Sequence, residues 1–316
     1  MIGTDINKAI ELLRRDELVA IPTETVYGLA GNALSAAAVA TIFAVKNRPS
    51  FDPLIVHTSS IERLKSFAQT IPQPAQILAE AFMPGSLTLL LPRQSIIPDI
   101  VTAGSPLVAL RIPDHPLTLE LLSKLDFPLA APSANPFGYI SPTTARHVEQ
   151  QLGDKIPYIL DGGACRVGLE STIVGFENQE VIVYRKGGIA LEAIEKLVGK
   201  VTVKPHSTSN PQAPGMLKSH YAPRVPLILG NLDELLKQHA NKKVGIISFQ
   251  KTHANIPENQ QITLSSKGDF TEAARNLFAG MRHLDGLDLD IILAELVPER
   301  DLGRAINDRL RRAAVV

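Results

Sequence analysis

Hydrophobic and polar positions along residues 1–200 follow two periods in turn, one typical of helices and one typical of strands. Apolar residues recur at helical spacing in segments such as Ile6–Arg15 and Ile61–Ala68. Between such segments lie short apolar runs rich in strand-forming residues, at Leu18–Ile21, Leu87–Leu91, Leu107–Ile112 and Val181–Tyr184. This alternation predicts an α/β or α+β domain with a sizeable sheet.

The pattern stops over residues 204–224, which carry four prolines, several Ser, Thr and Asn residues and no apolar periodicity. Such a composition is typical of a linker. After it, strand-like and helix-like segments alternate again, at 226–230, 232–239, 244–249, 271–284 and 291–296. The sequence therefore predicts a large domain over 1–203, a linker over 204–224 and a small doubly wound α/β domain over 225–316.

Composition narrows the class of protein. The 316 residues include 32 Lys or Arg and 32 Asp or Glu, and 45% are apolar, which is ordinary for a folded protein and excludes a disordered or histone-like chain. Residues 1–200 hold 17 basic and 20 acidic side chains, a net charge of −3, and the remainder hold 15 and 12, a net charge of +3. Because both charges are small, we expect neither half to be a general nucleic-acid binder.

The lone cysteine, Cys165, excludes an internal disulfide and a multi-cysteine metal site, so the sequence predicts a cytoplasmic protein. Residues 25–45 carry no charge, but Gly28, Gly31 and Asn32 interrupt them, and we expect no membrane span. The sequence also lacks the P-loop, the common dinucleotide fingerprint, the hydrolase elbow and the zincin motif. Several frequent kinds of active site are therefore disfavoured.

Polar runs interrupt the apolar sequence, and each has a structural and a functional interpretation. Pro22–Leu29 follows a predicted strand, where α/β folds place ligands, although helix or turn capping also explains its Thr and Glu residues. Lys46 and Arg48 stand at the end of a predicted helix at 35–45. They suit either a phosphate chain or the negative end of the helix dipole.

Four single residues keep two interpretations open. His57 ends an apolar run and is typical of either a strand end or a site. Arg111 lies in a predicted buried strand, where its charge needs an internal carboxylate or a ligand carboxylate. Ser141 is expected to cap a helix that begins at Pro142 and continues over 145–151, or to mark a phosphate site. Cys165 has no base beside it in the sequence, which favours a structural thiol.

Taken together and in order, six runs resemble the threonylcarbamoyl-adenylate synthases, a family with a YrdC-like catalytic domain. The runs are Pro22–Leu29, Lys46–His57, Pro84–Pro92, Ala131–Asn135 with Ser141–Thr143, Asp161–Val174 and Pro214–Pro223. The last run, and the ending Gly303–Arg311, resemble the longer two-domain branch. The resemblance implies a twisted mixed sheet around an open, positively lined cavity, a linker that closes over it as a lid, and a smaller Rossmann-like C-terminal domain.

The resemblance implies an enzyme that combines L-threonine, bicarbonate and ATP, with Mg²⁺, into threonylcarbamoyl-adenylate and pyrophosphate. The adenylate would pass to a downstream tRNA threonylcarbamoyl transferase, which modifies the adenosine next to the anticodon. This chain alone is not expected to bind tRNA tightly. One alternative is an RNA-binding module. A second alternative is a carbamoyl-adenylate-forming enzyme of hydrogenase maturation, and the sequence disfavours this enzyme because it has no cysteine-rich zinc region or acylphosphatase-like extension.

The resemblance also implies roles for thirteen residues. The implied threonine pocket consists of Thr25, His57, Arg111, Ala131 and Ser171. The implied ATP contacts are Lys46 beside the triphosphate, Arg48, Asp52, Leu107, Ser133, Ser141, Arg185 and, from the linker, Tyr221. Asp52 and Leu107 stand where the family commonly has Asn and Thr, so a contact at Leu107 is doubtful and Asp52 suits phosphates only with a cation such as Mg²⁺ between them. No metal ligands are assigned, and Arg309, Arg311 and Arg312 are expected on a solvated terminal helix.

Overall fold

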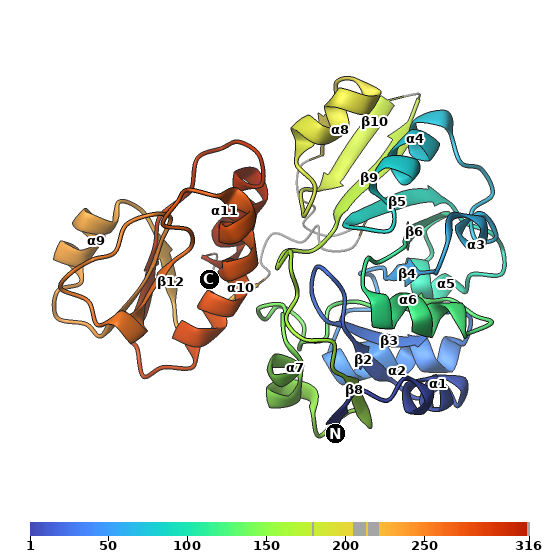
Figure 1. The fold of residues 1–316 in the computed structure, drawn as a ribbon, viewed down its shortest axis with the longest axis horizontal. Helices are drawn as coiled ribbons and strands as arrows, with labels where there is room; N and C mark the ends of the chain where they lie inside the picture. Colours follow the sequence, from blue (N-terminus) through green and yellow to red (C-terminus); the bar gives the residue numbers. More distant parts are fainter. Residues whose placement is uncertain (179, 205–212, 214–220, 315–316) are drawn as a thin grey trace.

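A computed structural model describes residues 1–178, 180–204, 213 and 221–314. Its secondary structure forms two separate sheets, one built before residue 204 and one after residue 226 (Figure 1). Most of the predicted linker and lid, 204–224, lies outside the described residues. No helix in the described ranges has the length and apolar character needed to cross a membrane.

The first sheet has eleven strands and mixes parallel with antiparallel pairs. Its helices pack around it, with a large apolar core between them. In order across the sheet the strands are β1 (Ile2–Gly3), β8 (Tyr158–Leu160), β2 (Val19–Ile21), β3 (Gly28–Asn32), β7 (Leu129–Ala130), β4 (Ile55–His57), β6 (Leu107–Arg111), β5 (Leu87–Pro92), β9 (Thr172–Glu177), β10 (Glu180–Arg185) and β11 (Thr202–Val203). The helices are α1 (Ile6–Arg14), α2 (Ala36–Lys46), α3 (Ile61–Lys65), α4 (Gln73–Phe82), α5 (Asp99–Thr102), α6 (Pro116–Ser123), α7 (Ala145–Leu152) and α8 (Leu191–Val198).

Helix α2 shows why one of these segments folds as it does. Ser35 accepts a hydrogen bond from the Ala38 amide (3.3 Å) and thereby begins the helix. Asn47 ends it in the left-handed conformation, which a short polar residue tolerates. Val39, Ile42 and Phe43 of the helix pack into the core, and Arg48 follows in the next loop.

The second sheet has four strands, all parallel, in the order β12 (Leu227–Leu229), β15 (Ile291–Ala294), β13 (Val244–Ser248) and β14 (Gln261–Thr263). Helix α9 (Leu232–Gln238) covers one face, whereas α10 (Phe270–Asp285) and α11 (Gly303–Ala313) cover the face toward the larger domain (Figure 1). A short 3-10 helix, η1, spans Glu258–Gln260. This arrangement confirms the predicted smaller parallel α/β unit.

The core of the C-terminal domain continues into loops of the larger domain. Val26, Ile140 and Leu169 belong to the same buried cluster as Phe278 and Ile306, which lie on α10 and α11. Arg282 of α10 donates to the Ser141 carbonyl (3.2 Å) and to the Gln151 side chain (2.9 Å). The two sheets are therefore joined by a packed, hydrogen-bonded interface.

Candidate active site

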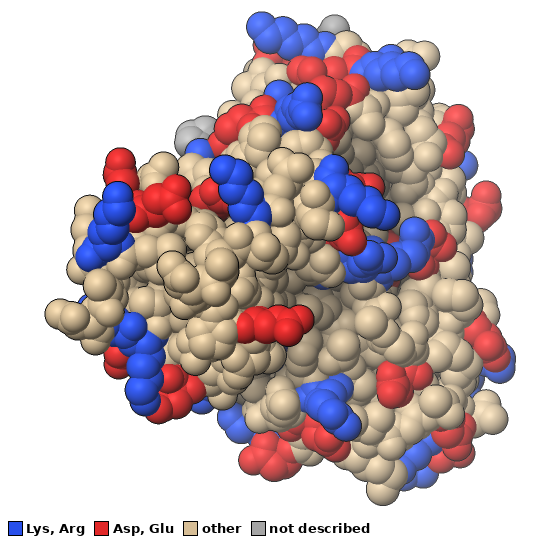
Figure 2. Space-filling model, turned by 60° about the vertical axis from the view of Figure 1, so that its left-hand side comes forward, with Lys and Arg blue, Asp and Glu red and all other residues tan. Residues whose placement is uncertain are grey.

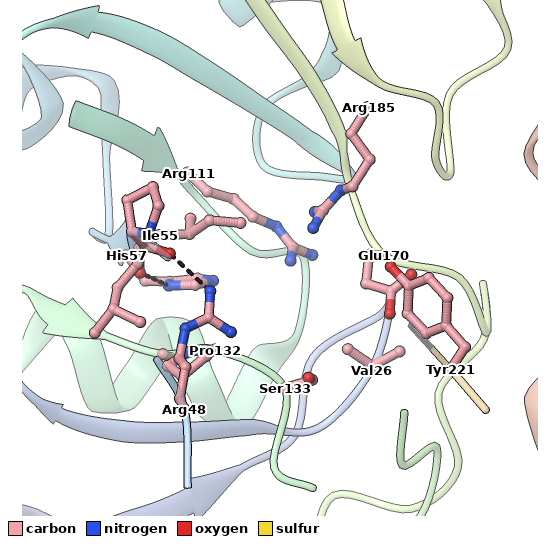
Figure 3. Close-up of a pocket in the computed structure, with 13 residues that line it drawn as sticks. Val26, Arg48, Ile55, His57, Arg111, Pro132, Ser133, Glu170, Arg185 and Tyr221 are labelled. Carbon is pink, nitrogen blue, oxygen red and sulfur yellow. Dashed lines mark hydrogen bonds between the residues drawn. The ribbon is translucent and has the colours of Figure 1, made fainter. Parts of the chain in front are cut away.

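A cavity lies where the ends of several strands of the large sheet meet the loops beside them (Figure 3). Strands β4, β6 and β10 each deliver one polar side chain at their carboxyl end, namely His57, Arg111 and Arg185. The complete lining is Val26, Arg48, Pro53, Leu54, Ile55, His57, Arg111, Ala131, Pro132, Ser133, Glu170, Arg185 and Tyr221. Three guanidinium groups thus face one cavity, which is the arrangement expected for binding anionic oxygens.

Strand register places His57 beside Arg111. β4 and β6 run parallel, and His57 is the register partner of Arg111, so both side chains leave the sheet at one edge. Burial, together with the nearby charge of Arg111, lowers the pKa of His57 to about 3. The imidazole is therefore neutral at physiological pH and is too weak a base to take a proton from a substrate amine.

The buried charge of Arg111 finds a partner inside the protein. Arg111 Nη2 donates to Glu24 Oε1 (2.6 Å) and to Thr25 Oγ1 (2.8 Å). The Asp114 amide donates to the other oxygen of Glu24 (3.0 Å). Burial alone raises the pKa of Glu24, but Arg111 and these hydrogen bonds outweigh it and lower that pKa. Glu24 thus fixes the guanidinium of Arg111, which also lines the cavity.

Arg48 is held in the same way by its own loop. It forms an ion pair with Asp52 (2.9 Å), and it donates to the backbone oxygens of Asp52 (3.0 Å) and Pro53 (2.8 Å). Asp52 is fully buried. The negative charge that departs from the family's common Asn therefore lies against Arg48.

Arg185 is positioned through Ser171. Its Nε and Nη2 donate to the backbone and side-chain oxygens of Ser171 (both 3.0 Å), and Ser171 Oγ is hydrogen-bonded with Thr88 Oγ1 (2.7 Å). Burial lowers the pKa of Arg185 to about 10, which still leaves it charged at neutral pH. Ser171 therefore orients the guanidinium group of Arg185, which lines the cavity.

The structure brings most of the sequence-predicted residues together. Seven of them line the cavity: Arg48, His57, Arg111, Ala131, Ser133, Arg185 and Tyr221. Three others contact arginines that line the cavity: Thr25 contacts Arg111, Asp52 contacts Arg48 and Ser171 contacts Arg185. Leu107 lies apart, at the opposite end of β6 from Arg111, where it packs against apolar residues of the sheet. The assigned substrate contacts of all thirteen stay predictions.

Lys46 is not among the residues that line the cavity. Its ammonium group donates to the Ser133 carbonyl (2.6 Å) and to the Asn135 carbonyl, and the side chain is buried. Burial lowers the pKa of Lys46 well below its usual value. In this structure Lys46 braces the loop that carries Ser133.

Two sequence expectations are wrong. Thr144, not Ser141, caps helix α7 by accepting from the His147 amide (3.2 Å), whereas Ser141 Oγ donates to Glu170 Oε1 (2.6 Å). The terminal helix is not solvated on all faces: Arg309 and Arg312 are buried, and only Arg311 is exposed. Arg309 follows the buried Ile306 by three residues, so it lies on the apolar face of the helix, a pattern readable from the sequence.

Sequence reasoning also missed three functional candidates. Glu24 and Glu170 were inside the motifs but received no role, and Arg309 was assigned to the surface. Arg309 Nε donates to Glu170 Oε2 (2.9 Å), and Glu170 lines the cavity. Cys165, in contrast, behaves as expected. It is buried, and burial raises the pKa of its thiol to about 12, which excludes a ready nucleophile.

These features define a two-domain α/β protein in which three arginines line one cavity. Residues 11–187 match the family model named for Sua5, YciO and YrdC and described as "Telomere recombination". Residues 189–315 match the "Threonylcarbamoyl-AMP synthase, C-terminal domain". The chain belongs to the threonylcarbamoyl-AMP synthase family, in its long two-domain branch.

Relatives support the assignment over nearly the whole chain. The chain is 41% identical to a threonylcarbamoyl-AMP synthase of Pyrococcus abyssi, covering 98% of this chain and 94% of the relative. It is 38% identical to one of Bacillus subtilis, covering 98% and 92%. The crystal structure of P. abyssi Sua5 complexed with L-threonine superimposes with a TM-score of 0.93 at 39% identity, covering 99% of this chain and 97% of that one.

Proposed function

We propose that this protein makes threonylcarbamoyl-adenylate and pyrophosphate from L-threonine, bicarbonate and ATP, for threonylcarbamoylation of tRNA next to the anticodon. The observation that carries the proposal is the convergence of Arg48, Arg111 and Arg185 on one buried cavity. The substrates present a carboxylate, a carbamate and a triphosphate, and bidentate guanidinium groups recognise all three. The P. abyssi relative solved with L-threonine supports the amino-acid substrate.

The chemistry asks the protein to position reactants rather than to attack them. Threonine's amine loses a proton and adds to carbon dioxide derived from bicarbonate, and loss of a second proton leaves a carbamate. A carbamate oxygen then forms a bond to the α-phosphorus of ATP while the bond to pyrophosphate breaks. Positive groups fixed in a buried site stabilise the charge on the leaving group and hold the reactants in line. No protein nucleophile is required, in keeping with the buried Cys165 thiol.

The arginines divide into two proposed roles. Arg111, backed by Glu24 and beside His57, binds the threonine carboxylate through the part of its guanidinium that faces the cavity. Arg48 and Arg185 contact the nucleotide with Ser133 and Tyr221. We propose that Mg²⁺ enters with ATP. Among the described residues no group of three or more His, Cys, Asp or Glu side chains could hold a metal ion, so the phosphates and water would supply its ligands.

Other parts of the proposal concern partners and location. A downstream transferase would receive the adenylate, because a mixed anhydride hydrolyses readily in water. The balanced charge of the chain supports weak tRNA binding by this protein alone. The single, buried, unpaired cysteine suits the reducing cytoplasm.

The test is pyrophosphate release from ATP and Mg²⁺, with threonine and bicarbonate omitted in turn and the adenylate identified by mass. We expect release that needs both compounds. Release indifferent to threonine would point to another acceptor. A salt-sensitive tRNA shift without any pyrophosphate release would favour the RNA-binding alternative and overturn the proposal.

A further inference from the structure

Tyr221 lines the cavity with one side of its side chain and contacts the C-terminal domain with the other. Its ring lies 5.1 Å from the guanidinium carbon of Arg309 and 4.7 Å from that of Arg312, both on α11. The ring of Phe278, on α10, lies 5.4 Å away, centroid to centroid. Tyr221, which lines the cavity (Figure 3), thus rests on two helices of the smaller domain.

Arg312 makes this contact in an unusual way. It is 3% exposed, and its three guanidinium nitrogens form no hydrogen bond to any residue that the structure describes. Its charge is paired with the buried Asp308, whose Oδ2 lies 3.5 Å from Arg312 Nη1. A buried guanidinium normally requires hydrogen-bond partners. The face of the Tyr221 ring is a second neighbour of this guanidinium, and an aromatic face attracts a cation electrostatically, more strongly when both are desolvated.

Arg309 links the same helix turn to a second part of the cavity wall. Its Nε donates to Glu170 Oε2 (2.9 Å), and its Nη2 donates to the Lys186 carbonyl (2.9 Å). Glu170 itself lines the cavity and accepts from Ser141. Two arginines one turn apart on α11 therefore contact two residues that face the site.

The backbone of Tyr221 also needs support from its surroundings. Its φ is +68°, in the left-handed region that residues other than glycine rarely adopt. Such a conformation persists when neighbouring contacts hold it in place. The following amide, of Ala222, donates to the Gly138 carbonyl (2.9 Å), which anchors the chain on the catalytic domain. The ring contacts from α11 and α10 add to this constraint.

We propose that Arg312 and Arg309 are positioning residues that hold the Tyr221 ring against the cavity, so that the C-terminal domain completes the nucleotide-binding wall. The inference rests on the proposed function. With the ring held, the cavity is prepared for ATP and water is kept from the carbamate. Without the contacts from Arg312 and Arg309, the Tyr221 ring is in place in only a fraction of the molecules. The apparent affinity for ATP is then reduced in proportion to that fraction.

The experiment compares Arg312→Gln, Arg312→Lys and Arg311→Gln in the full chain. Arg311 is the matched control, because it is adjacent in sequence but exposed and pairs with Glu299 at the surface. We expect Arg312→Gln to raise the KM for ATP by about 2- to 30-fold, the range of a cation–π contact, and to change kcat less. Arg312→Lys keeps a cation over the ring and should recover part of that change, while Arg311→Gln should resemble the wild type.

A Tyr221→Leu background separates positioning through the ring from a general structural effect. If Arg312 acts through Tyr221, adding Arg312→Gln to Tyr221→Leu changes the KM for ATP little further. An equal fold-change in both backgrounds, or equal KM values for Arg312→Gln and Arg311→Gln, overturns the proposal. Urea unfolding of every variant identifies any that fails to fold, and Arg312→Lys then carries the comparison.

The two proposals fail in different ways. If the wild type makes no adenylate, the proposed function fails. The positioning contact is then judged by the urea unfolding of wild type, Tyr221→Leu, Arg312→Gln and the double variant. Additive changes in unfolding free energy would show that the two side chains do not interact and would overturn it.

Discussion

Single residues of this site both stabilise the fold and have a proposed role in substrate binding, and Arg111 is the clearest case. Its charge is buried, and the partner that compensates it, Glu24, lies 87 residues away in sequence. Removing one member of a buried ion pair leaves the other uncompensated, at a cost of about 3–5 kcal/mol. Substitution of Arg111 therefore combines a loss of stability with any loss of threonine binding.

A double variant separates these two effects. We expect Arg111→Ala to lower the free energy of unfolding by about 3–5 kcal/mol and to raise the KM for threonine. Adding Glu24→Gln should recover much of the stability, because no carboxylate is then left without its partner, but it should not recover the KM. Arg48→Ala, by comparison, is expected to reduce kcat chiefly. Unchanged threonine affinity in Arg111→Ala would sink this division of roles.

His57 gives a pH dependence with a definite sign. Its pKa falls from the usual 6.5 to about 3 in the folded protein. Between these values the unfolded chain holds one proton more than the folded chain at this site. The stability from His57 is therefore full above pH 6.5 and is lost as pH falls, at up to about 1.4 kcal/mol per pH unit.

Urea unfolding at pH 5 and pH 7 checks this expectation. The wild type should lose about 2 kcal/mol more than His57→Gln over this interval because of the single histidine. His147→Gln is a useful comparison, since burial lowers the pKa of His147 to about 4 and gives the same sign. Identical pH slopes for the wild type and His57→Gln would show that His57 titrates normally in the folded state.

At the scale of elements, the structure and the family resemblance give different roles to Lys46, the last residue of α2. The structure has its ammonium group on the carbonyls of Ser133 and Asn135, whereas the family resemblance implies a place beside the triphosphate. If bracing dominates, Lys46→Met leaves two buried carbonyls without their donor and lowers the unfolding free energy by about 1–3 kcal/mol.

Kinetics and stability measured together decide between the two roles. Bracing predicts a loss of stability together with raised KM values for both substrates, because the loop that carries Ser133 relaxes. A triphosphate contact predicts a raised KM for ATP alone, with stability unchanged. Lys65→Met, which removes the same charge from an exposed position on α3, is the matched control and should leave stability and both KM values as in the wild type.

Local patterns predicted the elements well and the contacts between them poorly. The helix expected at Ile6–Arg15 spans Ile6–Arg14, and the strand expected at Val244–Phe249 spans Val244–Ser248, because apolar period and capping are local properties. Strand order is not local: β5 pairs with β9 across some 85 residues. The same limit applied to the site. The resemblance identified residues that line the cavity, but the roles of Glu24 and Arg309 as ion-pair partners became visible only in the three-dimensional structure.

At the scale of the whole molecule, the two domains share one core and several buried polar contacts. Val26 and Leu169, from loops of the large domain, pack in the cluster that contains Leu277 and Ile306. Arg309 is fully buried and pairs with Glu170 of the large domain and with Asp308 of its own helix, so separating the domains would take this arginine away from the buried carboxylate of Glu170. We infer that the chain unfolds as one cooperative unit rather than as two.

A single thiol can report on this cooperativity. Leu277→Ala removes a fully buried side chain from the C-terminal core, 112 residues from the only cysteine, and should cost about 2–5 kcal/mol. Cys165 is buried in the large domain and should react with a thiol reagent only after unfolding. If the domains unfold together, Leu277→Ala shifts the urea concentration at which Cys165 becomes reactive by as much as it shifts the loss of helix seen by circular dichroism. If Cys165 keeps its wild-type midpoint while part of the helix signal is lost earlier, the domains are independent, and the C-terminal domain could not hold the cavity wall in the manner that α11 indicates.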